Sequence, residues 1–106
     1  ADIADPATIG VTIIWGIFGG PISGRELVEW DQVYDDVTFD WSMETTGVLG
    51  KMDFDNIATH ELGHTMGMGD LYNLCLDETM YGYSTEAETK KRDLNSGDIT
   101  GINGLY

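Results

Sequence analysis

The chain has 106 residues and 42% hydrophobic side chains, a length and composition that fit one small globular domain with a modest core. Nineteen acidic residues against five basic ones give a formal net charge of −14, which argues against nucleic acids and anionic membrane surfaces as partners. No apolar run is long enough to span a bilayer, and the single cysteine, Cys75, cannot form a disulfide within the chain.

The N-terminal third has the composition of a β-hairpin. Residues 8–18 are rich in β-branched and aromatic side chains, which favour a strand, and residues 19–24 have the composition of a turn. Residues 25–34 alternate apolar and acidic side chains, as a half-exposed strand does. We expect residues 37–41 either to extend this sheet as a short strand or to lie across its end.

Two further sets of residues in this part of the chain carry expectations. We expect all three tryptophans to lie in the core: Trp15, Trp30 and Trp41. Four aspartates cluster around the end of the second strand: Asp31, Asp35, Asp36 and Asp40. Their oxygen atoms suit a calcium ion, but their spacing is not that of an EF-hand loop. They are therefore either a calcium site or solvated loop carboxylates.

A helix is expected to start at Asp53 or Asp55, because either carboxylate can cap the free N–H groups of a first turn. It continues through His64 and ends at Gly67, since glycine readily takes the left-handed conformation that closes a helix. Residues 68–88 are expected to be irregular.

The C-terminal residues predict a second, short helix that starts near Ser96 or Gly97. Ser96 can cap it, and Ile99, Ile102 and Leu105 recur at helical spacing. We therefore expect this apolar face to pack inward.

The stretch HELGHTMGMGD, residues 60–70, carries the chemistry. His60 and His64 are four residues apart, which places them on one helix face with Cβ atoms about 6 Å apart, close enough to share a zinc ion. Glu61 is rotated by about 100° from His60, so it reaches a water on the metal more easily than the metal itself. This arrangement, HExxH, supplies two ligands and a general base.

A catalytic zinc usually has a third protein ligand, and Asp70 is placed to supply it. Gly67 can turn the backbone sharply back toward the metal, and the Asp70 carboxylate arrives three residues later. The sequence thus predicts hydrolysis of a peptide bond by a metal-activated water, with Glu61 as general base. The alternative is a polar helix surface whose two histidines are satisfied by other contacts.

The same stretch resembles the signature of the metzincin metallopeptidases, HExxHxxGxx followed by His or Asp. Its final aspartate resembles the snapalysins, whereas the sequence around it is more similar to the matrixins. TMYGYS, residues 79–84, resembles the Met-turn, which implies that Met80 lies beneath the zinc as a hydrophobic base. LNSGDITGINGLY, residues 94–106, resembles the closing helix of the matrixins.

The resemblance extends from about Val28 to the end of the chain. It implies an α+β, metzincin-like catalytic domain: a small twisted sheet with an active-site helix, a Met-turn and a C-terminal helix. It also implies a secreted zinc endopeptidase that acts on polypeptide substrates, in a family that carries structural calcium. Tyr81 matches the Met-Tyr pair of the matrixins and is either structural or part of the S1′ pocket. Tyr83 does not fall where an astacin-type tyrosine does, so it is expected at most to line the substrate pocket.

The beginning of the chain departs from the family. Metzincin domains start with a strand, a long helix and a second strand, and too few residues precede Thr8 to hold them. We therefore expect residues 1–106 to form a single domain that is either the C-terminal portion of a longer catalytic domain or a minimised version of it. Self-association or the missing N-terminal segment would then cover an unpaired sheet edge. A zinc-binding but non-catalytic fragment, or an acidic binding module, is the alternative function.

Cys75 lies between Asp70 and Met80 in the sequence. It is expected to be a buried free thiol, a partner for a cysteine in another segment, or a thiolate that approaches the metal as an inhibitor.

Overall fold

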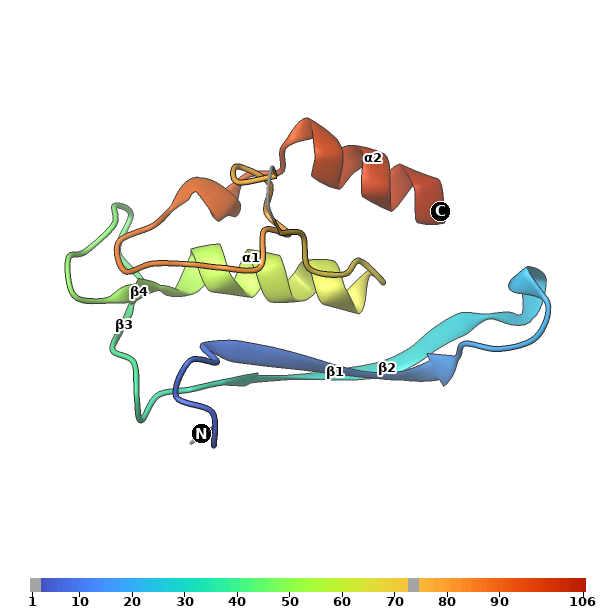
Figure 1. The fold of residues 1–106 in the computed structure, drawn as a ribbon, viewed down its shortest axis with the longest axis horizontal. Coiled ribbons are helices and arrows are strands. Elements are labelled where there is room, and N and C mark those ends of the chain that lie inside the picture. Colours follow the sequence, from blue (N-terminus) through green and yellow to red (C-terminus); the bar gives the residue numbers. More distant parts are fainter. Residues whose placement is uncertain (1–2, 73–74) are drawn as a thin grey trace.

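The computed structural model describes residues 3–72 and 75–106. Its most prominent feature is the predicted hairpin, in which β1 (Gly10–Ile17) pairs antiparallel with β2 (Glu26–Tyr34). A short 3₁₀ turn, Ile22–Gly24, lies in the connecting loop. The hairpin projects beyond the rest of the molecule (Figure 1). The whole molecule measures 47 × 30 × 24 Å.

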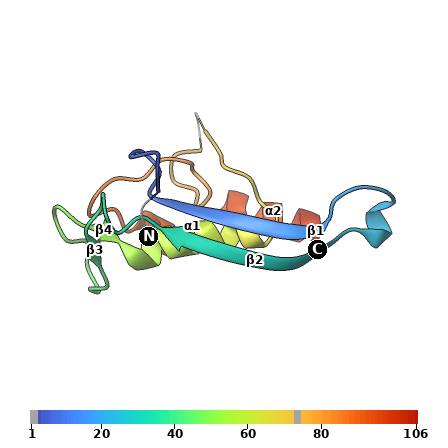
Figure 2. The same ribbon diagram turned by 90° about the horizontal axis from the view of Figure 1, so that it is seen from below.

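The molecule is layered, with the hairpin at one side, α1 (Phe54–Thr65) against it and α2 (Ser96–Leu105) beyond α1 (Figure 1). The view from below places both helices behind the hairpin (Figure 2). In the described part of the chain each hairpin strand pairs along one edge only, so two edges stay open. No helix in that part is long and apolar enough to cross a membrane.

Only one face of the hairpin is covered, and the expectation that Trp15 and Trp30 lie in the core is wrong. Thr12 and Ile14 are half-buried on the face of β1 that meets α1, while the side chains between them point outward. Trp15 lies on the outward face and is 46% exposed. Trp30 pairs with Ile14 and therefore lies on the same face as Ile14, but it is still 52% exposed. Trp41 is half-buried, with its ring centroid 5.7 Å from that of Tyr34.

Residues 37–41 do not extend the hairpin sheet. The carboxylate of Asp35, the residue after β2, accepts hydrogen bonds from the N–H groups of Val37 and Thr38, both at 2.9 Å. This turn ends the strand. The chain then forms β3 (Trp41–Ser42), which pairs in parallel with β4 (Met52–Asp53) as a separate two-stranded sheet.

The first predicted helix is confirmed at both ends. Asp53 caps α1 by accepting a hydrogen bond of 2.9 Å from the N–H of Asn56. At the other end Gly67 has a φ of +94°, and its N–H donates to the carbonyl of His64 at 3.0 Å. The N–H of the next residue donates to the carbonyl of Gly63 at 3.1 Å, which completes a Schellman motif.

The described residues between the helices are irregular, as expected, apart from a bridge between Leu71 and Tyr81 and a 3₁₀ turn, Lys90–Arg92. Asn73 and Leu74, which fall in the same predicted irregular stretch, lie outside the described residues.

The second helix, α2, has the predicted extent but a different cap and a different buried face. Its N-cap is Asn95 rather than Ser96, in a capping box with Asp98. Ile99 and Leu105 are 48% and 54% exposed, so the expected apolar inward face is wrong. The buried residue of α2 is Asp98, because its carboxylate accepts backbone hydrogen bonds from the preceding turn.

The interior beneath α1 is largely polar. Its buried apolar side chains are Met52, Ile57 and Met80. The fully buried side chains of largest volume are, apart from Met80, polar or charged: Lys91, Asn56, Thr79, Asp35, Asp53 and Asp98. Each of these has at least one hydrogen bond, as buried polar groups generally require.

Candidate metal and catalytic site

A cleft of about 520 Å³ separates the start of the hairpin from α1 and the segment that follows it. Residues 7–12 contribute one part of its lining, and residues 67–70 and 82–84 contribute others. His60, Glu61 and His64 line it from α1, and a ligand atom of each lies within 4.8 Å of the others.

The two imidazole rings are held in one tautomer by backbone carbonyls. Nδ1 of His60 lies 2.7 Å from the carbonyl oxygen of Thr79, and Nδ1 of His64 lies 2.8 Å from that of Met68. A carbonyl can only accept, so each Nδ1 must carry the donated proton. In a neutral ring this leaves the lone pair on Nε2, the atom that points into the cleft.

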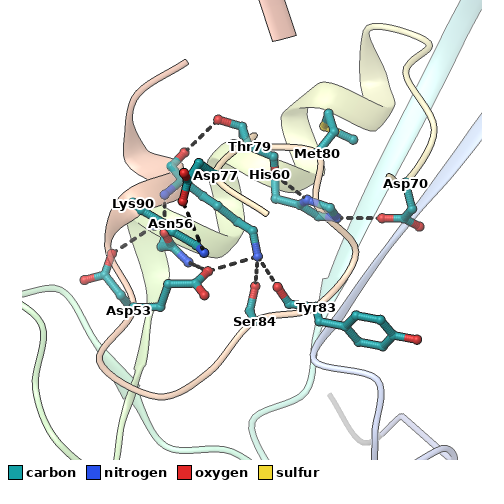
Figure 3. A network of polar contacts seen from close by, with 12 residues as sticks. Asp53, Asn56, His60, Asp70, Asp77, Thr79, Met80, Tyr83, Ser84 and Lys90 are labelled. Atoms are coloured by element: carbon teal, nitrogen blue, oxygen red, sulfur yellow. Dashed lines mark hydrogen bonds and ion pairs between the residues drawn. The ribbon is translucent and has the colours of Figure 1, made fainter. Parts of the chain in front are cut away.

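Asp70 completes a convergent set of acceptor atoms. Its Oδ1 lies 3.0 Å from Nε2 of His60 (Figure 3). The same oxygen lies 3.3 Å from Nε2 of His64. Two ligand atoms that each lie about 2.0–2.1 Å from a tetrahedral zinc ion are about 3.4 Å apart. With neutral imidazoles, three lone pairs face one another and no proton lies between them. Such an arrangement suits a metal ion.

Glu61 is buried and faces β1. Its Oε2 accepts a hydrogen bond from the hydroxyl of Thr12, and a Cβ at Gly10 would lie 3.3 Å from its Oε1. Tyr34 lies nearby, where burial and the negative charge of Glu61 raise the pKa of its phenol to about 12. The carboxylate of Glu61 is thus held by strand β1, whereas that of Asp70 is directed at the two imidazoles.

Met80 packs against α1 and directly follows Thr79, whose carbonyl oxygen bonds to Nδ1 of His60 (Figure 3). Its side chain is buried against Gly63, where a Cβ would lie 2.1 Å from the Met80 sulfur. The N–H groups of Thr79 and Met80 donate to the Asp98 carboxylate at 2.9 and 3.2 Å. The turn is therefore fixed by α1 on one side and by α2 on the other.

Comparison with known proteins shows the family of this chain. The sequence profile of the matrixin family matches residues 26–106, most of the chain. The chain belongs to the matrixin family. It is also similar to Metalloendoproteinase 4-MMP of Arabidopsis thaliana, with 34% identity over 55 residues. That match covers 52% of this chain and 15% of the plant protein, so the chain spans a small part of its relative's length. No solved structure matches it.

The small α+β fold is consistent with part of a matrixin domain, and matrixins use zinc. The family membership supports a metalloprotease. Tyr81 and Tyr83, the two tyrosines considered for the substrate pocket, lie in different surroundings. Tyr83 is exposed and lines the cleft, with its ring centroid 5.3 Å from that of Tyr72. The ring of Tyr81 lies within 6 Å of the amines of Lys90 and Lys91, at 5.9 and 5.7 Å.

The expected calcium site has no support in this matrixin. Among residues 3–72 and 75–106, no three carboxylates that include the aspartate cluster lie close enough together to share an ion. The Asp35 carboxylate instead builds the turn after β2, and hydrogen bonds from Thr38 and Val37, led by the N–H of Thr38, lower its pKa. Cys75 is exposed rather than buried, and it is not part of the converging group in the described residues.

Three residues that position the site are absent from the sequence-based prediction: Thr12, Gly63 and Asp98. A glycine inside a predicted helix is a signal of close packing, so Gly63 could have been found. Thr12 and Asp98 act through contacts across 49 and 19 residues of sequence, for which no local pattern exists.

Proposed function

We propose that this matrixin is a zinc-dependent endopeptidase in which His60, His64 and Asp70 hold the metal and Glu61 is the general base. The observation that carries the proposal is the convergence of Asp70 Oδ1 on the two Nε2 atoms, at 3.0 and 3.3 Å. Three protein ligands and an open cleft are the donor set of a catalytic zinc. The backbone carbonyls at both Nδ1 atoms supply the outer contacts that metal-binding histidines need.

The division of roles between the two carboxylates follows from what each one contacts. Asp70 lies after the turn at Gly67, and Oδ1 of its carboxylate contacts Nε2 of both imidazoles. Glu61 is held by Thr12 on the hairpin side of the cleft. A carboxylate that is near the metal site but bound elsewhere suits a general base better than a ligand.

The cleft residues then perform the reaction in a simple sequence. His60, His64 and Asp70 would hold a zinc ion, which when bound would polarise the scissile carbonyl as a Lewis acid. Glu61 takes a proton from the attacking water and later delivers it to the leaving amine nitrogen. An extended polypeptide substrate lies between the walls that β1 and residues 82–84 contribute.

The test measures zinc content and casein cleavage for the wild-type chain and for two pairs of variants. Glu61→Ala should keep zinc but lose at least about 100-fold in kcat/KM, whereas Glu86→Ala, at an exposed position, should change neither. Loss of a residue that only hydrogen-bonds to a metal ligand weakens metal binding by up to about 100-fold. Asp70→Ala removes a ligand itself, so it should weaken zinc binding by more than about 100-fold. Asp77→Ala, whose side chain is 88% exposed, is its control.

A zinc-binding but non-catalytic fragment is the second candidate. It is favoured by the two open edges of the hairpin and by the small share of the plant relative that the chain spans. Stoichiometric zinc without cleavage in the wild-type chain would support this candidate, and absence of zinc binding would reject the metal site. An extracellular location, a single domain over residues 1–106 and self-association of the hairpin edge stay predictions.

A further inference from the structure

We infer that Thr12 is a positioning residue for Glu61: it holds one carboxylate oxygen so that the other faces the reaction. The inference rests on the proposed function. Thr12 lies on β1 and Glu61 on α1, and the threonine hydroxyl contacts both ends of the glutamate. It donates to Oε2, and it lies 3.1 Å from the backbone carbonyl oxygen of Glu61.

The chemistry of the hydroxyl decides which of these contacts dominates. A threonine hydroxyl carries one proton, so it donates to one oxygen at a time. An ionised carboxylate is a stronger acceptor than a neutral carbonyl. The donated bond therefore goes to Oε2 whenever Glu61 is ionised, and the carboxylate is anchored to the hairpin.

Gly10 shapes the position of the second oxygen. A Cβ at Gly10 would lie 3.3 Å from Oε1 of Glu61, so the missing side chain leaves room for this oxygen. Gly10, Thr12 and Glu61 all line the cleft. With Oε2 bound to Thr12, Oε1 is the oxygen left to exchange a proton with water. Strand β1 thus determines which oxygen acts as the base.

Orientation matters because glutamate is a flexible side chain. A free carboxylate samples several rotamers, and only a few of them aim an oxygen at the reacting water. Holding the side chain before substrate arrives removes this loss from the reaction step. Removal of the hydroxyl should therefore lower kcat and leave substrate binding unchanged.

The kinetic test compares Thr12→Val, which keeps the shape but removes the hydroxyl, with Thr12→Ser, which keeps the hydroxyl. Thr12→Val should lower kcat about tenfold with KM and zinc affinity within about twofold of wild type, and Thr12→Ser should keep most of the activity. Thr46→Val, at an exposed loop position, is the matched control. Equal activity of Thr12→Val and wild type, or equal loss in both Thr12 variants, would overturn the inference.

A second measurement does not depend on activity. Urea unfolding with excess zinc is compared for Thr12→Val, Glu61→Ala and the double variant. If Thr12 bonds to Glu61, the double variant should lose clearly less than the sum of the two single shifts in urea midpoint. Additive shifts would overturn the inference whatever the activity. The two ideas can fail separately. If the variant shifts are coupled but the wild-type chain binds zinc without cleaving casein, the contact is confirmed and the proposed function is rejected.

Discussion

The hairpin and the interior beneath α1 reverse the usual relation between hydrophobicity and burial. Every second residue of β1 is apolar and substantially exposed: Val11, Ile13, Trp15 and Ile17. Beneath α1, in contrast, charged and amide side chains are fully buried, among them Lys91, Asn56 and Asp98. In these two regions burial follows hydrogen-bonding partners more than side-chain hydrophobicity, and the candidate metal site lies on the side of the polar interior.

The polar interior reaches the candidate site through a short chain of contacts. The Asp98 carboxylate accepts the N–H of Thr79 at 2.9 Å, and the carbonyl oxygen of Thr79 lies 2.7 Å from Nδ1 of His60. The tautomer of a proposed ligand thus depends on an aspartate at the start of α2. None of the contacts described above links the exposed side chains of β1, Val11, Ile13, Trp15 and Ile17, to the candidate site.

The largest effect is expected from Asp98→Ala. It leaves the N–H groups of Thr79, Met80 and Asn95 without their acceptor, so unfolding free energy should fall by about 3 kcal/mol or more. Zinc affinity should fall with it, because the Thr79 carbonyl loses its fixed position. Urea unfolding and a zinc competition assay measure the two effects. Asp77→Ala, which removes an exposed carboxylate, should change neither, and an equal loss there would contradict the role of Asp98.

A smaller loss is expected from Gly63→Ala. The new Cβ would lie 2.1 Å from the Met80 sulfur, so Met80 and its turn must move. Overpacking of this kind costs about 1–3 kcal/mol, more than the ~1 kcal/mol that alanine gains over glycine in a helix.

Gly104→Ala is the matched control for this change. Gly104 is also helical, but no atom lies within 4 Å of a Cβ built there. It should therefore be neutral or up to ~1 kcal/mol stabilising in thermal unfolding. If Gly63→Ala and Gly104→Ala change the thermal stability equally, the contact with Met80 does not restrict position 63.

The dependence of stability on pH should separate the two regions. Hydrogen bonds from Arg92 hold the pKa of Asp53 below its usual range. Burial tends to raise the pKa of Asp98, but N–H groups led by that of Thr79 more than offset it, and the net pKa is lowered. A carboxylate with a lowered folded pKa stabilises the fold above its unfolded value of about 3.9 and loses this as pH falls through the folded value. The polar interior should therefore weaken below about pH 4.

The contact between hairpin and helix should fail at the opposite extreme. The pKa of Tyr34 is raised to about 12, so its stabilising effect is complete below the unfolded value of about 10 and is lost as pH rises through 12. Urea midpoints measured across pH should fall at both ends. Arg92→Met should flatten the acid limb alone, and Tyr34→Phe should flatten the alkaline limb alone.

The smallest effect is expected on the outward face of the hairpin. Ile13 is 43% exposed, and threonine suits a strand as well as isoleucine does, so Ile13→Thr should change stability by about 0.5 kcal/mol or less. The same substitution at Ile57, which is buried in α1, should cost about 2–4 kcal/mol. A large loss from Ile13→Thr in urea unfolding would mean that the outward face is covered in solution.

The sequence was most informative where structure is local. The cap at Asp53, the four-residue spacing of His60 and His64 and the closing turn at Gly67 all lie within one helix and its ends. Their geometry follows from the helical repeat and from the conformational freedom of glycine. Oδ1 of Asp70 lies close to both imidazoles, and its role as a metal ligand stays a prediction.

Expectations failed where they depended on distant contacts. Trp15 and Trp30 are large and aromatic, but Trp15 lies on the hairpin face away from α1, and Trp30 stays exposed although it pairs with Ile14 on the other face. The apolar residues of α2 have helical spacing, and yet the buried face is set by Asp98, which bonds to a turn nearly twenty residues earlier. Local periodicity carries no information on such partners.

The burial of Lys91 gives the cleft a built-in chemical reporter. Lys91 is fully buried, and its amine bonds to Glu88, to the carbonyl of Tyr83 and to the hydroxyl of Ser84. The other lysine side chains, Lys51 and Lys90, are exposed. An amine-acylating reagent should therefore modify these two at once and Lys91 only when the cleft wall at residues 83–84 detaches. The rate of Lys91 acylation, followed by peptide mass spectrometry, would time the opening of that wall.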